Sequence, residues 1–150
     1  EVDITVPADH ILDATTVPAD ITDKTASMAA DIGLKLAESL DLIGLLAVEM
    51  FVMRDGTVVM NEIAPRPHNS GHWTQDGAQT SQFEQFVRAI TGQPLGETKM
   101  TRPVKMQNLI GDAVKQLPSF FTNPNAKIHL YGKQEVRPGR NMGHVNILEP

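Results

Sequence analysis

The chain has 150 residues, of which 41% are hydrophobic and 21% charged, and its formal net charge is −5. This composition is ordinary for a globular chain, and the acidic balance disfavours nucleic acid or an anionic membrane as a partner. No cysteine is present, which excludes disulfides and thiolate metal sites, and no apolar run reaches transmembrane length. The sequence begins at Glu1 rather than Met, so we expect a piece of a longer polypeptide.

The first part of the chain predicts a strand and a helix. Apolar and polar residues alternate over residues 2–6, which is typical of a half-buried strand, and residues 10–18 have the composition of a loop with a turn. Thr22 or Asp23 can cap a helix that runs to about Leu40, with apolar side chains on one face. We expect this face to pack on a sheet and assign no chemistry to the helix.

Two antiparallel strands are predicted next, over residues 43–53 and 57–63. The Asp55-Gly56 dipeptide lies between these apolar runs. Asp-Gly in this position is a strong hairpin signal, because both central residues of a type I′ turn need positive φ. We therefore predict a hairpin whose loop consists of these two residues.

The register of this hairpin brings two glutamates face to face. With a two-residue loop, Glu49 lies opposite Glu62, with Cβ atoms roughly 4.5–5.5 Å apart on one side of the sheet. Facing carboxylates repel unless a cation lies between them, and Mg²⁺ is usually held by one or two carboxylates together with substrate phosphates. The hairpin therefore predicts a metal–phosphate site. The alternative is a pair of solvated glutamates on an open sheet face, and a three-residue loop would shift the register.

The segment after the second strand, APRPHNSGHWT over residues 64–74, is rich in polar side chains. Two prolines bracket Arg66 and restrict the chain to an extended path, while Gly71 allows the backbone to approach a ligand closely. The candidate donors in this segment are Arg66, His68, Asn69, Ser70 and His72. A rigid loop just beyond a carboxylate pair favours a binding site over an ordinary polar surface loop.

These segments together resemble a known family. Glu49, the Asn61-Glu62 pair, the APRPHNSGHWT run and the TSQFE segment at residues 80–84 are similar to the C-terminal half of the N5-carboxyaminoimidazole ribonucleotide synthetases, which are ATP-grasp enzymes of purine biosynthesis. The resemblance extends over roughly residues 11–147, and the PRPHNSGH run is its most specific part. Formate-dependent glycinamide ribonucleotide transformylases share PRPH but usually continue with Asp-Thr-Gly.

A helix and a smaller unit follow the binding loop. Ser81 and Glu84 form a capping-box pattern for a helix over residues 81–90. Beyond residue 95 we expect strands over residues 104–110, 127–131 and 142–147 and a short helix over residues 112–121. The predicted fold is α+β: an ATP-grasp C-terminal lobe, with an antiparallel sheet and packed helices, in residues 1–94, followed by a small β-rich subdomain in residues 95–150.

A basic loop lies between the last two predicted strands, over residues 132–140. Lys133, Arg137 and Arg140 supply charged donors that suit a phosphate ester, although composition alone favours a solvated turn. In the family that the chain resembles, a Lys and an Arg seven positions apart in this loop hold the ribose 5-phosphate of the substrate. Lys133 and Arg140 have this spacing.

The resemblance implies a role for each group of residues. Glu49 and Glu62 are implied to bind Mg²⁺ on the phosphates of ATP, and Asn61 to belong to the same nucleotide site. Arg66 is the implied catalytic residue, because it can steady an anionic intermediate. The implied substrate-binding residues are Arg66, His68, Asn69, Ser70, Lys133, Arg137 and Arg140. Ala64 stands where many relatives have Asn, which argues against a second tightly held Mg²⁺.

The implied reaction joins bicarbonate to 5-aminoimidazole ribonucleotide. Bicarbonate attacks the γ-phosphate of ATP to give carboxyphosphate, and its carboxyl group, or the CO₂ released, is captured by the amine of the ribonucleotide. Family membership also implies a cytoplasmic homodimer, with the N5-carboxyaminoimidazole ribonucleotide mutase as a functional partner. The ATP lid and the adenine-binding hinge lie outside this sequence, so we expect the fragment alone to be inactive. Two alternatives stay open: a related enzyme that uses formate, and a non-catalytic assembly lobe.

Overall fold

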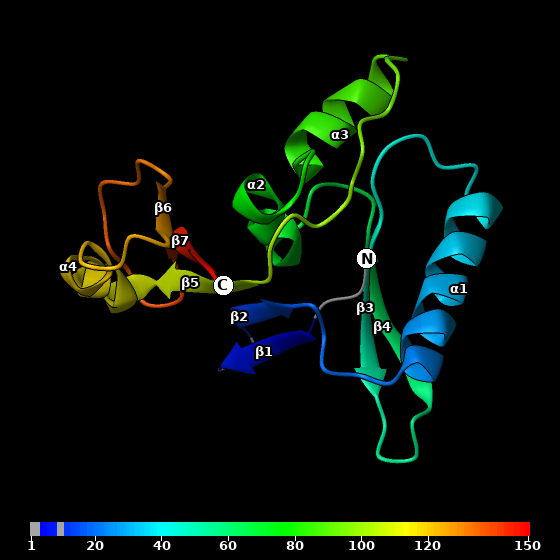
Figure 1. The fold of residues 1–150 in the computed structure, drawn as a ribbon, viewed down its shortest axis with the longest axis horizontal. Helices are drawn as coiled ribbons and strands as arrows, with labels where there is room; N and C mark the ends of the chain where they lie inside the picture. The colour runs from blue at the N-terminus through cyan, green and yellow to red at the C-terminus, as the bar shows by residue number, and fades with distance from the viewer. Residues whose placement is uncertain (1–3, 9–10) are drawn as a thin grey trace.

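The computed structural model describes residues 4–8 and 11–150 and contains two antiparallel sheets with helices around them (Figure 1). One sheet has five strands in the order β1-β2-β5-β7-β6, and the other is the β3–β4 pair. The strands are β1 (Ile4–Ala8), β2 (Ile11–Val17), β3 (Ala47–Val52), β4 (Val58–Ala64), β5 (Val104–Ile110), β6 (Ala126–Leu130) and β7 (Asn141–Leu148). The helices are α1 (Asp23–Ser39), α2 (Thr74–Gly77), α3 (Gln82–Ile90) and α4 (Leu117–Phe120), with 3-10 helices η1 (Asn69–Trp73) and η2 (Gly111–Gln116). The predicted α+β class is confirmed.

The two longer helices begin at the residues that the sequence indicated. Thr22 caps α1 by accepting a hydrogen bond from the backbone N–H of Thr25 at 3.2 Å, and Ser81 caps α3 in the same way from Glu84 at 3.2 Å. The carboxylate of Glu84 pairs with Arg88 at 2.7 Å. The capping box is therefore formed only in its first half, because the acidic side chain points along the helix.

The expected loop over residues 10–18 is wrong, because most of this segment is strand β2. Thr15 and Val17 are buried to 0% and 2% exposure, and β2 pairs with β5. The β-branched side chains favour a strand, but the threonines hid the alternation of buried and exposed positions. Strands β1 and β2 thus join a sheet completed by the C-terminal strands. This sheet draws on both predicted units, 1–94 and 95–150, so that division remains a prediction.

The β3–β4 hairpin has the predicted pairing of Glu49 with Glu62, but its loop and register differ from the prediction. The N–H of Met53 donates to the carbonyl of Thr57 at 2.8 Å, so the loop has three residues and ends at Gly56, whose φ is 82°. The two-residue loop was therefore wrong. A bulge next to Glu49 then shifts the pairing by one residue, and Glu49 faces Glu62 as predicted. A three-residue loop with a left-handed Gly is a common hairpin connection, and the bulge offsets the register change that it causes.

The core joins the five-stranded sheet to the segment after β4. It contains Val17, Val104, Met106 and Leu148 from the sheet together with Trp73 from η1, which is 2% exposed. The segment predicted as an extended loop is therefore extended only up to His68 and then turns into η1. Because Trp73 is buried in the sheet, the polar residues before it are fixed relative to both sheets.

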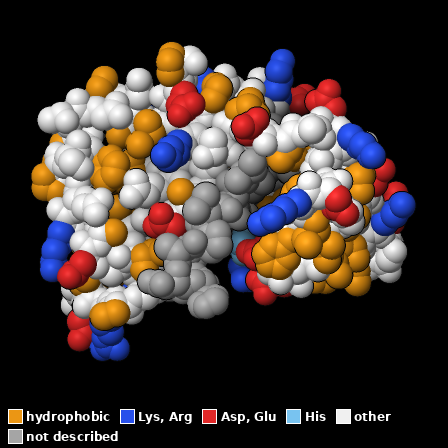
Figure 2. Space-filling view, turned by 90° about the horizontal axis from the view of Figure 1, so that it is seen from below, with side chains coloured by type: hydrophobic (Ala, Val, Ile, Leu, Met, Phe, Trp, Pro, Cys, Tyr) orange, Lys and Arg blue, Asp and Glu red, His pale blue; other side chains and the backbone are white. Residues whose placement is uncertain are grey.

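The surface carries charges of both signs. Figure 2 shows basic and acidic side chains interspersed on one face, with hydrophobic side chains gathered in patches between them. In residues 4–8 and 11–150, no helix combines the length and the apolar character that crossing a membrane requires.

Candidate functional site

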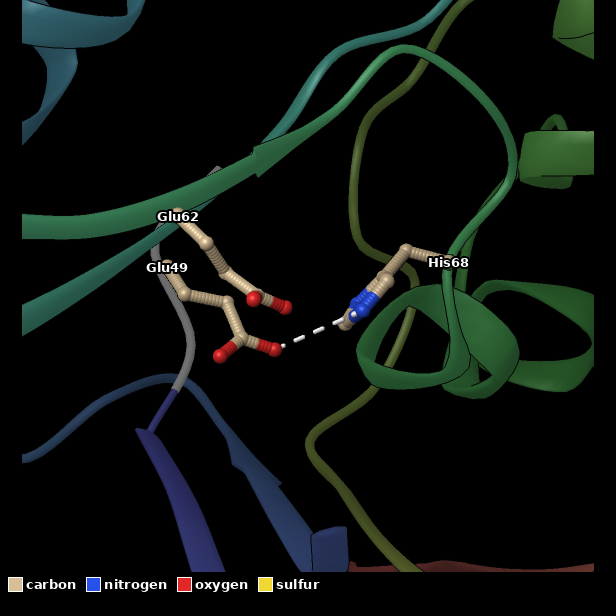
Figure 3. A group of neighbouring side chains, drawn as sticks. All are labelled: Glu49, Glu62 and His68. Carbon is tan, nitrogen blue, oxygen red and sulfur yellow. Dashed lines mark ion pairs between the residues drawn. The ribbon is translucent and has the colours of Figure 1, made fainter. Parts of the chain in front are cut away.

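Two carboxylates and an imidazole meet where the hairpin faces the loop after β4 (Figure 3). Glu49 comes from β3, Glu62 from β4 and His68 from the residue that precedes η1. One ligand atom from each lies within 4.8 Å of the other two. The ring Nε2 of His68 is 3.4 Å from Oε1 of Glu49, and its side chain is 12% exposed. The sequence grouped His68 with the substrate residues, whereas the structure places it beside the carboxylate pair.

The hydrogen bonds around the His68 ring define which nitrogen carries the hydrogen. The backbone N–H of Ser70 donates to Nδ1 at 3.3 Å, and the Ser70 hydroxyl lies 3.0 Å from the same atom. Nδ1 is therefore an acceptor, and Nε2 bears the hydrogen that points at Glu49. His68 in this state orients a carboxylate oxygen by a hydrogen bond and offers no lone pair to a metal.

Asn61 reaches the same site because of the bulge. Neighbours on a regular strand face opposite sides, so the alternation alone gave no way for Asn61 and Glu62 to share a site. The bulge sets both residues against Glu49, and the Asn61 amide Nδ2 lies 3.5 Å from Oε2 of Glu49. The pairing of an amide with two carboxylates is thus a product of the backbone irregularity.

The donor set of this site fits a hard divalent cation. Two carboxylates project toward the same point, and Glu49 is 41% exposed on its side chain, so the oxygens can be approached. Hard cations such as Mg²⁺ take oxygen ligands and commonly use one or two carboxylates plus phosphate oxygens. Glu49 and Glu62 are the residues that could hold such a cation, with Asn61 and His68 arranged around them.

The remaining predicted residues of the loop have different surroundings. Arg66 is exposed, donates to the carbonyl of Pro67 at 3.0 Å, and lines an open groove of about 710 Å³ between α1, β3 and the loop. Ser70 lines the same groove. Among the described residues, the side-chain Oδ1 of Asn69 is buried and has no hydrogen-bond partner. The Arg66 guanidinium is therefore accessible to a ligand, whereas the unpartnered Oδ1 of Asn69 is enclosed by protein.

A stack of rings supports the loop from behind, and the sequence did not predict it. His72 lies between Phe83 and His144, with centroid distances of 5.5 and 4.8 Å, and His129 stacks on His144 at 4.6 Å. Burial, with smaller effects from neighbouring histidines, lowers the pKa of His72 to about 4 and that of His144 to about 3. His72 and His144 are therefore neutral packing groups at neutral pH. His72, a candidate donor in the sequence, therefore serves the structure of the loop.

Two polar side chains extend this support. Asp76 of α2 lies 2.7 Å from Nε2 of His129, and the amide of Asn146 donates to Asp76 at 2.7 Å and to the carbonyl of His72 at 3.2 Å. Asn146 is 0% exposed. The loop after β4 is thus bonded directly to β7. No sequence signal indicated this contact, because the residues lie more than 70 positions apart.

The basic loop is held differently. Lys133 donates to the carbonyl of Asn141 at 2.6 Å and lies over the Tyr131 ring, 5.5 Å from its centroid. Arg140 donates to the carbonyl of Glu135 at 3.3 Å, and Arg137 forms an ion pair with the Glu135 carboxylate. The structure thus gathers the three cations within one loop. It connects them to the carboxylate site through the ring stack, because the Tyr131 hydroxyl lies 2.7 Å from Nδ1 of His144.

Gln82 is a residue of the site that sequence reasoning missed. The sequence assigned no role to its side chain, and in the structure the side-chain amide bonds to the backbone N–H and carbonyl of His68. The one available signal was Gly71, at which a Cβ would lie 2.4 Å from the Gln82 Oε1.

Family comparison covers both ends of the chain. A model described as ATP-grasp domain matches residues 1–83, and one described as phosphoribosylaminoimidazole carboxylase C-terminal domain matches residues 105–150. The N5-carboxyaminoimidazole ribonucleotide synthase of Brucella melitensis biotype 1 is 50% identical over 112 residues, which are 75% of this chain and 31% of that protein. The corresponding protein of Bacillus subtilis is 50% identical over 115 residues, 75% of this chain and 30% of that protein. The chain spans about a third of the length of these curated relatives.

Solved structures agree with this similarity. The ADP complex of an N5-carboxyaminoimidazole ribonucleotide synthetase superposes with a TM-score of 0.94 at 46% identity, covering 98% of this chain and 39% of that one. The Aspergillus clavatus N5-carboxyaminoimidazole synthase in complex with ADP and 5-aminoimidazole ribonucleotide gives a TM-score of 0.94 at 35% identity, covering 99% of this chain and 42% of that one. The predicted resemblance is confirmed.

Proposed function

Because the chain belongs to the ATP-grasp family, we propose that it is the metal- and substrate-binding part of an ATP- and bicarbonate-dependent ligase. The reaction is carboxylation of 5-aminoimidazole ribonucleotide to N5-carboxyaminoimidazole ribonucleotide in de novo purine biosynthesis, through carboxyphosphate. The observation that carries the proposal is the Glu49–Glu62 pair of the hairpin with His68 held against it. The names of the relatives, one of them solved with ADP and this ribonucleotide, supply the substrate class.

The nucleotide is proposed to bind at the hairpin. ATP-grasp enzymes use ATP with a divalent metal, and the oxygen-rich donor set favours Mg²⁺. Glu49 and Glu62 would hold this ion, which when bound neutralises charge on the ATP phosphates. Asn61 and His68 each contact Glu49, so they fix the direction in which its oxygens point.

The acceptor is proposed to lie between the two loops. Arg66 is the catalytic residue, because its exposed guanidinium can steady an anionic acyl phosphate. Asn69 and Ser70 supply polar contacts, and Ser70 lines the groove beside Arg66. Lys133, Arg137 and Arg140 hold the ribose 5-phosphate as charged donors.

The wider setting follows from this function. We propose residues 1–94 and 95–150 as the two functional units, one for the metal and nucleotide and one for the substrate phosphate. The full-length protein is proposed to be a cytoplasmic homodimer whose product passes to the N5-carboxyaminoimidazole ribonucleotide mutase. Sedimentation of the full-length protein tests the dimer, and a single species of monomer mass would contradict it.

The function is tested by ADP release from the full-length protein in bicarbonate buffer, with and without 5-aminoimidazole ribonucleotide. We expect strong stimulation by the ribonucleotide, lost in Glu62→Gln and weakened in Lys133→Ala. Stimulation by formate with glycinamide ribonucleotide instead would replace this function with that of a transformylase. Absence of ADP release with either pair of substrates would leave a non-catalytic lobe.

A further inference from the structure

The amide of Gln82 pairs with both backbone polar groups of one residue of the site loop, His68. Its Oε1 accepts the backbone N–H of His68 at 2.9 Å, and its Nε2 donates to the carbonyl of His68 at 2.8 Å. The same Nε2 lies 2.9 Å from Nδ1 of His72. One side chain therefore holds the backbone on both sides of the His68 Cα and reaches the ring that packs behind it.

The chemistry of these contacts requires a neutral amide. Nε2 has two hydrogens, and both are used, one by the His68 carbonyl and one by the His72 ring. Nδ1 of His72 is an acceptor, in keeping with the lowered pKa of this buried ring. A carboxylate of the same shape could accept from the His68 N–H but would have no hydrogen for the other two partners.

The surrounding loop is shaped to admit the Gln82 side chain. Gly71 leaves the space that the amide occupies, since a Cβ there would lie 2.4 Å from Oε1 and 2.8 Å from Cδ. The backbone N–H of Gln82 donates to the hydroxyl of Thr74 at 2.9 Å, and this hydroxyl donates to the carbonyl of Gly71 at 2.6 Å. The start of α3 and the loop are thus bonded at several points around one side chain.

These contacts decide where the His68 ring lies. With its peptide held by Gln82 and its Nδ1 held by Ser70, the ring presents Nε2 to Glu49 at 3.4 Å. We propose that Gln82 is a positioning residue that places His68 against Glu49 of the Glu49–Glu62 pair and so sets the orientation of the Glu49 carboxylate for metal–nucleotide binding. This inference rests on the proposed function and specifies how its metal site is kept in order.

The same helix provides a matched control. Gln85 forms an equivalent pairing with the peptide of Gly96, in which Oε1 accepts the N–H at 2.9 Å and Nε2 donates to the carbonyl at 3.1 Å. Gln82 and Gln85 are thus the same type of residue on the same helix, and the side chain of each makes two hydrogen bonds to the backbone of one residue. Gln85 holds the backbone of Gly96, in the segment between α3 and β5, whereas Gln82 holds the backbone of His68, whose ring contacts Glu49.

The test measures Mn²⁺ binding to the full-length protein in the presence of ADP, from the electron paramagnetic resonance signal of free Mn²⁺. Loss of an outer-shell partner commonly weakens metal binding about 10–100-fold, so we expect Gln82→Leu to raise the Mn²⁺ dissociation constant about tenfold or more. Gln82→Glu should weaken binding too, and it stands in if the Leu variant does not fold. Gln85→Leu should lower the melting temperature comparably but keep the dissociation constant within about twofold of wild type.

A double variant separates positioning from general loosening. In a His68→Ala background, Gln82→Leu should add no further weakening, because the group that it places is gone. The proposal is overturned if Gln82→Leu binds Mn²⁺ as wild type does, if Gln85→Leu weakens binding equally, or if the two changes add in full. Since Mn²⁺–ADP binding needs neither bicarbonate nor ribonucleotide, this result stands apart from the ADP-release test. If the ribonucleotide did not stimulate ADP release but Gln82→Leu still weakened Mn²⁺–ADP binding, only the proposed reaction would be wrong, and the positioning role of Gln82 would stand.

Discussion

The loop after β4 and the loop before β7 both carry residues proposed to meet anionic ligands, yet they are held in opposite ways. The first is packed: His68 is hydrogen-bonded to Gln82 and Ser70, and Trp73 anchors the segment in the core. The second is exposed, and its cations bond to the carbonyl of Asn141 at the start of β7 and to Glu135 of the same loop. We therefore expect substitutions at His68 and its neighbours to affect both folding and binding, and substitutions in the exposed basic loop to affect mainly binding.

The largest effect expected from this difference is on substrate affinity. Replacing Lys133 and Arg140 by Ala should raise the KM for the ribonucleotide about 100-fold or more, because each removes a charge-assisted hydrogen bond of about 1.5–3 kcal/mol. The melting temperature should change by less than about 2 °C, since exposed ion contacts add little stability. Steady-state kinetics and thermal melts check both.

The control for that prediction removes two positive charges elsewhere in the same region. Lys115 and Lys127 lie on η2 and β6, and their replacement by Ala should leave the KM within about twofold. If this control raised the KM equally, general electrostatic attraction would explain the effect. A large fall in melting temperature after the loop changes would show that the exposed loop is structural after all.

The packed region should instead respond to acid. The folded pKa values of His72 and His144, about 4 and about 3, lie below the ordinary value of 6.5, so the unfolded chain binds more protons below pH 7. The stability that these two neutral histidines contribute to the folded protein is fully present above pH 6.5 and is lost as the pH falls toward 4. Between pH 7 and pH 5 the two together should cost on the order of 3 kcal/mol of unfolding free energy.

Urea unfolding of the full-length protein at several pH values measures this loss. His144→Phe keeps a flat ring for the stack with His129 and His72 but removes one titrating group. The loss between pH 7 and pH 5 should then fall to about half, on the order of 1.5 kcal/mol. If the free energy of unfolding of the His144→Phe variant fell as much between pH 7 and pH 5 as that of the wild type, His144 would not be a buried neutral group. Asp76 raises the pKa of His144, but this is the smallest of the effects on that group.

A smaller effect is expected at Gly71. Ala at this position would place a Cβ 2.4 Å from the Gln82 Oε1 and displace the amide from its partners. With two or three hydrogen bonds at about 1 kcal/mol each, and partial relaxation, we expect a loss of about 2 kcal/mol and weaker Mn²⁺–ADP binding. Gly33→Ala in α1 is the control, because nothing lies within 4 Å of its Cβ position and Ala favours a helix. Gly33→Ala should stabilise the protein slightly. If Gly71→Ala and Gly33→Ala changed the free energy of unfolding in the same direction, the packing argument for Gly71 would be wrong.

The sequence predicted the parts of this fold that depend on local patterns. Capping residues Thr22 and Ser81 gave the helix starts, and the apolar runs gave the hairpin strands. The facing of Glu49 and Glu62 was predicted from a two-residue loop, whereas the hairpin has a three-residue loop. The extra loop residue shifts the register by one position, and the bulge beside Glu49 shifts it back. The role of Asn61 depends on that bulge and could not be derived from a regular strand.

What the sequence could not predict lies in long-range packing. His72, His129 and His144 are far apart in the chain, and each by itself resembles a surface or ligand-binding histidine. Their stacking follows only once β6 and β7 pair and Trp73 enters the core. Local propensity contains no information on such contacts. The basic loop differs, because its three cations lie close together in the sequence and do not depend on a buried partner. Their proximity could therefore be predicted from the sequence alone.

The smallest predicted effect concerns the tip of the hairpin and separates it from the site. Gly56 has a φ of 82° and nothing within 4 Å of its Cβ position, so Gly56→Ala costs only the backbone strain of a left-handed residue, about 1 kcal/mol. Gly56→Asn should lose less, because Asn tolerates this conformation. Both should keep the wild-type Mn²⁺–ADP affinity, since neither change alters the length of the loop, which together with the bulge beside Glu49 sets the pairing with Glu62. A weakened affinity in the Ala variant but not in the Asn variant would instead place control of the register at the loop.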